Sequence, residues 1–446
     1  MKRTKLPTSD DSEKIEDESN SMARSETKST KGILRFLSPS HREWQELSPM
    51  IDDGAENTET KKRQANEAKE ALKETLLAGL QMPNLMVFAG SGTSLGPKIG
   101  GPSMWDLWDF AMHENPPTAQ GQNPTLCEES RAVMSTVGYD LSAQGENIEA
   151  FLSRCEAYIE VYPDQSVQAF VKKCKRITLE RCSSFLWDST SGEWKDEKLD
   201  GHGIFLHRLS RRRVRDPRLK IFTTNYDLCF ERAATLKSLI VIDGFSFAQP
   251  RRFGPSYFEY DIVRRSSIST EVGDPLEGVF HLLKLHGSVN WERDDNGGIC
   301  EKICPDTSKA CLIYPASGKY QQTYIQPHLE LMAQYLASLR QPNTCLIVTG
   351  FGFNDDHLAE PILAAITSNS QLRVIIADYK AEDYLSGRVD NANRYWNQLL
   401  ELAKSGENIW FVNASFEEFA NLLPDLKALT PAQQLEKTIR RIGTQS

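Results

Sequence analysis

The sequence of 446 residues lacks both a long apolar run and an apolar secretion signal. No stretch approaches the ~18 apolar residues that a membrane-spanning helix needs, so we expect no membrane segment. Without an apolar core near the N-terminus, export is not expected either. The nine cysteines follow no repeating frame, which is typical of reduced thiols in a cytosolic protein and not of a disulfide scaffold. We therefore expect a cytoplasmic protein.

Net positive charge is also lacking, because the formal net charge is −9. This balance argues against wholesale nucleic-acid binding. One segment is strongly basic in spite of the negative net charge of the chain. This basic run consists of Arg208, Arg211, Arg212, Arg213, Arg215, Arg218 and Lys220. The run is either a solvated helix end that pairs with acidic neighbours or an electrostatic patch for nucleic acid or a partner. No aromatic residue lies between positions 209 and 221, so the run has no stacking platform for single strands, and we expect no direct nucleic-acid binding.

The chain does contain ample material for a folded core. Apolar residues make up 39% of it and charged residues 25%, as in ordinary soluble globular proteins. Residues 1–60 are rich in Ser, Thr, Lys, Asp and Glu and predict a polar, largely flexible N-terminal tail. Two short exceptions, Ile33–Leu37 and Trp44–Leu47, indicate either a weakly ordered turn or a docking segment for another subunit. We expect one folded domain over residues 61–430 and a C-terminal tail over residues 431–446.

Short apolar runs alternate with amphipathic segments along this domain. The predicted strands cover residues 85–89, 219–222, 279–285, 311–314, 344–349, 372–377 and 409–412, and the predicted helices cover residues 62–81, 103–111, 327–339, 355–367 and 391–403. Such alternation favours a parallel, doubly wound sheet. From about Glu146 to Trp187 the pattern is helical. We therefore predict an α/β, Rossmann-like fold with a doubly wound, mostly parallel sheet and a helical insertion over residues 105–215.

The first predicted strand runs into a loop that reads Gly90, Ser91, Gly92, Thr93 and Ser94. Glycine lets the backbone approach a phosphate closely, and a following helix adds favourable dipole charge. The dinucleotide-binding fingerprint needs a third glycine three residues after the second, but Leu95 stands there. On these residues alone, a nucleotide site and a plain strand-to-helix turn both remain open.

Other predicted strands also end in polar or glycine-rich residues. One leads to Thr224, Asn225 and Asp227, and another leads to His286. Such ends are where open α/β sheets bind ligands, and an imidazole with an ordinary pKa of ~6.5 suits proton transfer. Taken alone, Asn225 or Asp227 is equally well explained as a helix cap. Two later strands are followed by a second glycine loop and by a carboxylate placed to hold a ribose hydroxyl, comprising Gly350, Phe351, Gly352, Phe353 and Asp378.

In this order the four loops resemble the SIR2 (sirtuin-like) NAD-binding family. Gly90-Ser91-Gly92-Thr93-Ser94 is similar to its Gly-Ala-Gly-x-Ser loop, Thr223-Thr224-Asn225-Tyr226-Asp227 to its Thr-Gln-Asn-Ile-Asp motif, and Leu285-His286-Gly287 to the segment with its catalytic histidine. Gly101-Pro102-Ser103 and Trp105 match the continuation found in prokaryotic SIR2-like proteins. Gly350-Phe351-Gly352 stands where the family has a glycine-rich NAD contact.

The sequence departs from the deacylases of this family. Cys300, Cys304 and Cys311 do not form paired CxxC ligands and have no fourth ligand nearby, so we expect no metal. The deacylase continuation Ser-Gly-Ile-Pro-Asp-Phe-Arg is absent, and the helical insertion is long. These departures shift the resemblance toward the NAD-hydrolysing SIR2-like effectors of bacterial antiphage defence. A chain of this size is most similar to the SIR2 subunits encoded beside a HerA-type ATPase.

The resemblance implies that NAD is the substrate and that water cleaves its nicotinamide–ribose bond. Asn225 would orient the water or the ribose hydroxyls, His286 would act as general base, and Asp227 would stabilise positive charge at the ribose. The other positions would hold the diphosphate and the adenosine half, and they are Gly90, Ser91, Gly92, Thr93, Ser94, Thr224, Gly350, Phe351, Gly352, Phe353 and Asp378. A homo-oligomer or a HerA-type ATPase partner would supply control.

Two other functions remain open. A protein deacylase or ADP-ribosyltransferase would use the same pocket with an acyl-lysine or a protein side chain as acceptor, and it would need a peptide groove. A nucleotide-sensing scaffold subunit would bind NAD or ADP-ribose without turnover. Rapid NAD loss without a peptide would count against the first, and product formation would count against the second.

Overall fold

The computed structural model describes residues 34–39, 43–48, 58–114, 125–188, 190–212, 216–264, 274–303, 305–314, 325–388 and 393–425. Several predicted features lie outside the described residues, namely most of the N-terminal tail, the C-terminal tail over residues 431–446, Arg213, Arg215 and Cys304.

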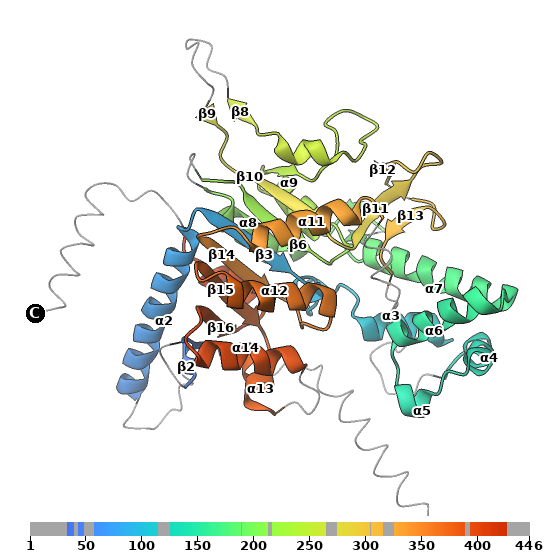
Figure 1. Ribbon diagram of the computed structural model, residues 1–446, viewed down its shortest axis with the longest axis horizontal. Coiled ribbons are helices and arrows are strands. Elements are labelled where there is room, and N and C mark those ends of the chain that lie inside the picture. Colours follow the sequence, from blue (N-terminus) through green and yellow to red (C-terminus); the bar gives the residue numbers. More distant parts are fainter. Residues whose placement is uncertain are drawn as a thin grey trace, which may run out of the picture.

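A sheet of nine strands crosses the molecule in the order β2-β1-β16-β15-β14-β3-β6-β10-β7 (Figure 1). From β16 to β7 all neighbouring strands are parallel. The nine strands are β1 (Arg35–Leu37), β2 (Gln45–Glu46), β3 (Asn84–Ala89), β6 (Leu219–Thr223), β7 (Ile240–Ile242), β10 (Val279–Lys284), β14 (Thr344–Thr349), β15 (Leu372–Asp378) and β16 (Ile409–Asn413). The predicted α/β class with a mostly parallel, doubly wound sheet is confirmed.

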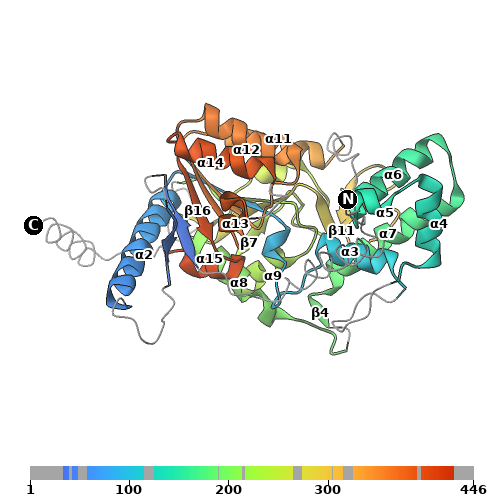
Figure 2. The same ribbon diagram turned by 90° about the horizontal axis from the view of Figure 1, so that it is seen from below.

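Alternate residues along the central strands face two separate cores. In β3, Met86 and Phe88 point into one core, whereas Leu85 and Val87 point into the other. The first core is covered by α11 (His328–Leu339), α12 (Asp356–Ser368), α13 (Ala381–Ser386) and α14 (Arg394–Lys404). The second is covered by α2 (Thr58–Leu80), α8 (Asp200–Leu209), α9 (Cys229–Leu236) and α15 (Phe416–Leu422). Figure 2 shows the two helical layers on opposite sides of the sheet.

The predicted strand over residues 311–314 does not join this sheet. It forms β13 (Ala310–Leu312), which pairs with β11 (Gly287–Arg293) in a separate antiparallel sheet with β12 (Ile299–Glu301). The chain turns at Gly287, where φ is 85°, and a Cβ there would lie 2.1 Å from the Cys311 carbonyl oxygen. A glycine at this point therefore lets β13 lie against the start of β11.

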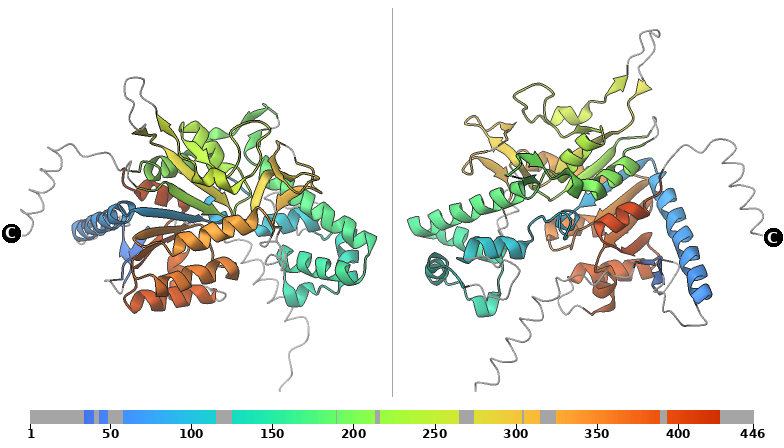
Figure 3. Two further views of the ribbon diagram at one scale, coloured as in Figure 1. Left: turned by 45° about the horizontal axis from the view of Figure 1, so that its top comes forward. Right: turned by 180° about the vertical axis from the view of Figure 1, so that it is seen from behind.

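Five helices form a group with a hydrophobic core of its own, beside the sheet (Figures 1 and 3). They are α3 (Met104–Met112), α4 (Glu128–Val137), α5 (Leu141–Gln144), α6 (Ile148–Val161) and α7 (Gln165–Ser184). Ser103 starts this group with a capping box, because its hydroxyl accepts from the Asp106 amide while the Asp106 carboxylate accepts from the Ser103 amide. The expected insertion extends to residue 215, but α8 packs on α9 and α15 against the sheet.

Short segments connect these parts. They are η1 (Ser91–Thr93), β4 (Trp187–Asp188), β5 (Glu193–Trp194), η2 (Asp196–Leu199), η3 (Pro255–Glu259), β8 (Val263–Arg264) and β9 (Asp274–Pro275). Two pairs of them, β4 with β5 and β8 with β9, form two-stranded antiparallel sheets.

Part of the expected N-terminal tail is ordered as sheet. β1 pairs antiparallel with β16, and β2 pairs antiparallel with β1. Phe36 is buried in the second core, and Arg35 forms ion pairs with Glu46 and Glu382. This intramolecular pairing differs from both the weakly ordered turn and the docking segment that the sequence suggested.

The described members of the basic run bind separate neighbours. Arg208 donates to backbone carbonyl oxygens at the end of α15, and buried Arg212 donates to those of the last residue of α2 and of the residues just after it. Arg218 pairs with Asp261 at 2.8 Å. Carbonyl groups at a helix C-terminus lack intrahelical partners and are satisfied by cationic side chains. Two of these arginines therefore act as helix caps.

Among the buried histidines that the structure describes, burial lowers the pKa of His202, His281 and His328 to about 4 in each case. His202 lies on α8 against the rings of Phe230 and Phe416, at centroid distances of 5.0 and 4.7 Å. Neither of its ring nitrogens has a hydrogen-bond partner among the described residues.

We predict that the free energy of unfolding falls as the pH is lowered below about 6.5, the ordinary histidine pKa. The unfolded chain binds protons there that folded His202 binds only near pH 4. His202→Leu is expected to remove about 2 kcal/mol of this loss between about pH 7.5 and about pH 5, as measured by denaturant unfolding at each pH. The control is His207→Leu, a partly exposed site on the same helix, which should remove far less. An unchanged pH dependence in His202→Leu would contradict the prediction.

Candidate functional site

The predicted site residues meet at the carboxyl ends of the parallel strands around β3. The chain passes from β3 to β6 on one side and later returns to β14 on the other, so β3 marks the switch point of the sheet, where such folds bind ligands. Ala89 is in register with Thr349 of β14 and with Thr223 of β6, and Thr223 is in register with Lys284 of β10. The four predicted loops that follow these strands therefore lie side by side.

The two glycine loops touch through their backbones. A Cβ on Gly92 would lie 2.6 Å from the Gly350 Cα, and one on Gly90 would lie 2.5 Å from the Gly350 carbonyl oxygen. The Gly92 amide donates to that carbonyl oxygen at 2.8 Å, and Gly350 has a φ of 61°. Packing of one loop on the other therefore requires all three glycines, independently of any phosphate.

Most backbone amides of the first loop already have acceptors. The Gly90 amide donates to Thr349 O at 3.0 Å, the Thr93 amide to Gly90 O at 3.1 Å, and the Ser94 amide to Ser91 O at 2.9 Å. The last two bonds form the short turn η1. Within Gly90–Ser94, only the Ser91 amide lacks an acceptor among the described residues, and Ser91 is exposed.

Thr93 and Ser94 fix the orientation of the Asn225 side chain. The Thr93 hydroxyl donates to Gly90 O at 2.9 Å, and the Ser94 hydroxyl donates to the Asp227 carboxylate at 2.7 Å. Because a hydroxyl has one proton, both oxygens face Asn225 as acceptors. The Asn225 amide nitrogen donates to both at 3.0 Å. Its carbonyl oxygen, at the other end of the amide, is buried and has no hydrogen-bond partner among the described residues.

Asp227 joins this loop to the start of α9. One carboxylate oxygen accepts from Ser94, and the other accepts from the Cys229 amide at 3.0 Å. The carboxylate therefore positions Ser94 directly and Asn225 through it. Thr224 is placed on the same segment, where its amide donates to Ala89 O at 3.2 Å.

His286 lies between β10 and β11 and is buried. Its ring stacks on that of His357, with centroids 5.7 Å apart and an interplanar angle of 20°. His357 belongs to the first turn of α12, which begins directly after the second glycine loop. His357 was not predicted from the sequence, because two histidines far apart in the chain give no local signal.

Lys284 is a second residue near the site that was not predicted from the sequence. It ends β10 two residues before His286 and is buried, with its ammonium group directed at the backbone that follows Asn225. Its signal in the sequence is a lysine inside the apolar run Val279–Leu285. Such a charge is rare in a buried strand unless it is paired.

Farther along the same sheet edge, Asp378 can contact a ligand, whereas Phe351 and Phe353 are part of the hydrophobic core. Asp378 ends β15, its carboxylate accepts from the Lys380 amide at 2.9 Å, and burial raises its pKa to about 6. It is therefore mostly ionised at neutral pH and able to accept a hydroxyl hydrogen bond. Phe351 and Phe353 instead pack into the first core, where Phe353 holds a φ of 58° against Trp396.

No group of three or more His, Cys, Asp or Glu side chains in the described ranges fits a metal ion. None of the helices in the part of the chain that the structure describes is both long and apolar enough to cross a membrane.

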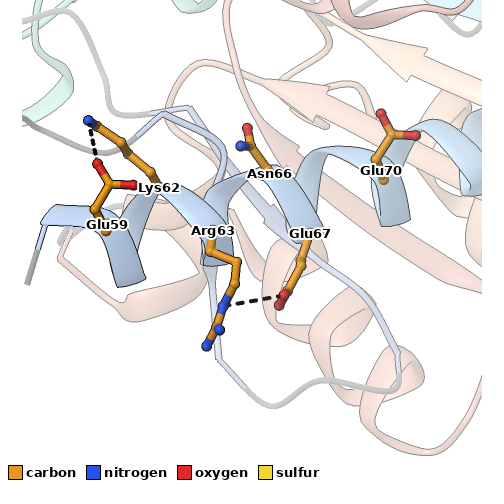
Figure 4. A pocket seen from close by; sticks show the side chains of 6 residues that line it. All are labelled: Glu59, Lys62, Arg63, Asn66, Glu67 and Glu70. Atoms are coloured by element: carbon orange, nitrogen blue, oxygen red, sulfur yellow. Dashed lines mark hydrogen bonds and ion pairs between the residues drawn. The ribbon is translucent and has the colours of Figure 1, made fainter. Parts of the chain in front are cut away.

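A hollow along α2 is lined by Glu59, Lys62, Arg63, Asn66, Glu67 and Glu70 (Figure 4). These side chains pair with one another, Glu59 with Lys62 at 3.1 Å and Arg63 with Glu67 at 3.8 Å. The hollow contains no predicted site residue and is separate from the site at the carboxyl ends of the strands around β3.

Residues 219–403 of the chain are similar to a family model that is described as a SIR2-like domain. The match covers less than half of the chain and includes Asn225, His286, Gly350 and Asp378. No curated protein matches the chain.

Two solved Sir2 structures are similar to the chain. One is a Sir2 variant with a deacetylated p53 peptide and 3′-O-acetyl ADP-ribose, at 10% identity and a TM-score of 0.32, covering 79% of this chain and 96% of that one. The other comes from work on the mechanism and regulation of Sir2 enzymes, at 10% identity and a TM-score of 0.32, covering 75% and 98%.

We predict that Gly92→Ala destabilises the protein by roughly 2 kcal/mol or more, whereas Gly352→Ala has a small effect. The first new Cβ would lie 2.6 Å from the Gly350 Cα, so the two loops would have to separate. The second would meet only the flexible Asn354 side chain, at 3.1 Å. Denaturant unfolding of both variants measures the difference, and equal stabilities would refute the close loop contact.

Proposed function

We propose that this protein is an NAD hydrolase that uses water to cleave the bond between nicotinamide and ribose. The observation that carries this proposal is the Asn225 carbonyl oxygen, a buried acceptor that is fixed in direction and lacks a partner among the described residues. Buried polar atoms are rarely left unpaired, so such an acceptor suits a bound water or a ribose hydroxyl. The SIR2-like match over residues 219–403 supports NAD as the substrate.

The reaction consumes one water and yields nicotinamide, ADP-ribose and one proton. The electron pair of the breaking bond leaves with nicotinamide, and positive charge develops at the ribose. Asn225 would orient the water or a ribose hydroxyl, and His286 would accept the proton of the attacking water. Asp227 would act through its negative charge and by positioning Ser94 and Asn225.

The order of strands suits the order of parts in NAD. Along the sheet edge, the loops of β10, β6, β3, β14 and β15 follow one another over about 19 Å. His286 and Asn225 lie at the nicotinamide end, and Asp378 lies at the adenosine end. The exposed Ser91 amide lies between them and would donate to the diphosphate. Ionised Asp378 would accept from a ribose hydroxyl.

Asn225→Ala and His286→Ala are each expected to lower kcat for nicotinamide release from NAD by at least about 100-fold. The first removes the fixed acceptor and the second removes the base. Chromatographic detection of nicotinamide gives the rate, near-UV circular dichroism checks folding, and His207→Ala serves as a remote histidine control. Undiminished release by either folded variant would remove that residue from the mechanism.

The same assay separates the other functions. Release that requires an acyl-lysine peptide would indicate a deacylase, and release that labels a protein would indicate an ADP-ribosyltransferase. Binding of ADP-ribose by a wild type that forms no product would indicate a scaffold subunit.

We further propose that the protein is a cytoplasmic homo-oligomer that depletes NAD during antiphage defence under the control of a HerA-type ATPase. The resemblance of its loops to those of SIR2-like defence effectors supports this part of the proposal. An NAD hydrolase that is always active would exhaust the NAD of its own cell, so its activity requires control.

Adding the HerA-type ATPase to the purified chain is expected to change kcat for nicotinamide release by at least about tenfold, because regulatory couplings are commonly of this size. The rates are compared at equal protein concentration, and size-exclusion chromatography reports the assemblies formed. The His286→Ala variant with the ATPase controls for NAD loss caused by the partner. Equal rates with and without the ATPase would exclude this form of control.

A further inference from the structure

Lys284 places an ammonium group inside the protein, between the two loops that carry Asn225 and His286. The side chain is 3% exposed. Its Nζ donates to the Tyr226 carbonyl oxygen at 3.2 Å and also to that of Asp227. The Ser288 hydroxyl and the Glu231 carboxylate each lie 2.8 Å from the same nitrogen, so its three protons are shared among four acceptors. Burial of an ammonium ion is costly without such acceptors, so these contacts hold it in place.

The acceptors belong to both sides of the proposed site. Tyr226 and Asp227 directly follow Asn225, and Ser288 lies two positions after His286. The Ser288 hydroxyl also donates to Tyr226 O at 3.3 Å, and the Val289 amide donates to the same oxygen at 3.0 Å. The two loops are therefore joined at one carbonyl group, and Lys284 supplies the charge at this junction.

The junction lies where the sheet ladder stops. Thr223 ends β6 and Lys284 ends β10, and these two residues are in register. The Leu285 amide still donates to Thr223 O at 2.8 Å. Asn225 and His286 each lie two residues beyond the paired positions, so the contacts of Lys284 extend the fixed region past the ends of the strands.

Glu231 supplies the countercharge from α9. Burial raises its pKa, and the neighbouring Lys284 ammonium opposes this effect. This carboxylate has no role in the proposed reaction. Removing this carboxylate together with the Lys284 ammonium group therefore separates two effects. One is the loss of the Lys284 contacts that join the two loops, and the other is the presence of an unpaired buried charge.

We propose that Lys284 is a positioning residue that sets the separation of Asn225 and His286 by tying the backbone after one to the loop after the other. This inference rests on the proposed hydrolase function. Lys284 acts through backbone groups, so its loss should lower turnover more than it lowers substrate binding.

The experiment compares Lys284→Met, the double variant Lys284→Met/Glu231→Gln, and Ser288→Ala with the wild type. The matched control is Lys220→Met, because Lys220 is a partly buried lysine on the neighbouring strand β6 that donates to the Ser338 hydroxyl at 3.4 Å. Three quantities are measured: kcat and KM for nicotinamide release, affinity for ADP-ribose, and hydrogen exchange in peptides that cover residues 224–229 and 286–290.

We expect kcat to fall about 100-fold in both Lys284 variants, because a displacement of about 1 Å between reacting groups has effects of this order. KM and ADP-ribose affinity should stay within about threefold, whereas hydrogen exchange in both loops should accelerate at least about tenfold. Lys220→Met should change none of these quantities beyond about threefold. This split between kcat and KM is not expected from a general loss of stability.

An undiminished kcat in the double variant would overturn the proposal, as would an equal loss in Lys220→Met. If the Lys284 variants do not fold, Ser288→Ala decides, because unchanged kcat and unchanged exchange in that variant would also overturn it. A wild type that releases no nicotinamide would refute the hydrolase function instead. Hydrogen exchange then tests by itself whether Lys284 holds the two loops together. Unaltered exchange in the double variant would refute that role of Lys284.

Discussion

Close contact between two glycine backbones, at Gly92 and Gly350, is the constraint on which the site depends. It allows the loops after β3 and β14 to meet at the switch point of the sheet, where a single Cβ would force them apart. The same contact sets the position of Thr93 and Ser94, the next residues in the first loop. Since these hydroxyls direct the Asn225 amide, the glycine packing determines the orientation of a proposed catalytic group.

The hydroxyl network transmits this orientation because each member has a limited number of protons. Thr93 and Ser94 give their protons to Gly90 O and to Asp227, so each can only accept from Asn225. A carboxylate thus controls the direction of a neutral amide two residues away. Asp227 is tied in turn to the α9 amide of Cys229, which connects the site to a secondary-structure element.

The sequence predicted the fold class and the meeting of the loops, because apolar runs, glycines and strand-end polar residues are local signals. The strand β13 was assigned to the wrong sheet, since its pairing depends on the turn at Gly287 and on contacts distant in sequence. His357 was missed for the same reason, whereas Lys284 stands out locally as a lysine in an apolar run but has partners that the sequence does not reveal. Arg208 and Arg212 showed a charge pattern but not the helix ends that they cap. Local patterns identify elements, whereas their partners are set by tertiary packing.

The two N-terminal strands have a consequence for how this protein associates. Without them, β16 would present a row of unpaired backbone groups from the apolar sequence Ile409–Asn413 at the margin of the sheet. An open margin of that kind is a template for strand addition from another chain and for aggregation. β1 covers it, and β2 then ends the sheet. This last strand consists only of Gln45 and Glu46, so it is too short and too polar to pair well with a further strand. The N-terminal segment thus keeps this sheet from growing by edge-to-edge pairing through β16.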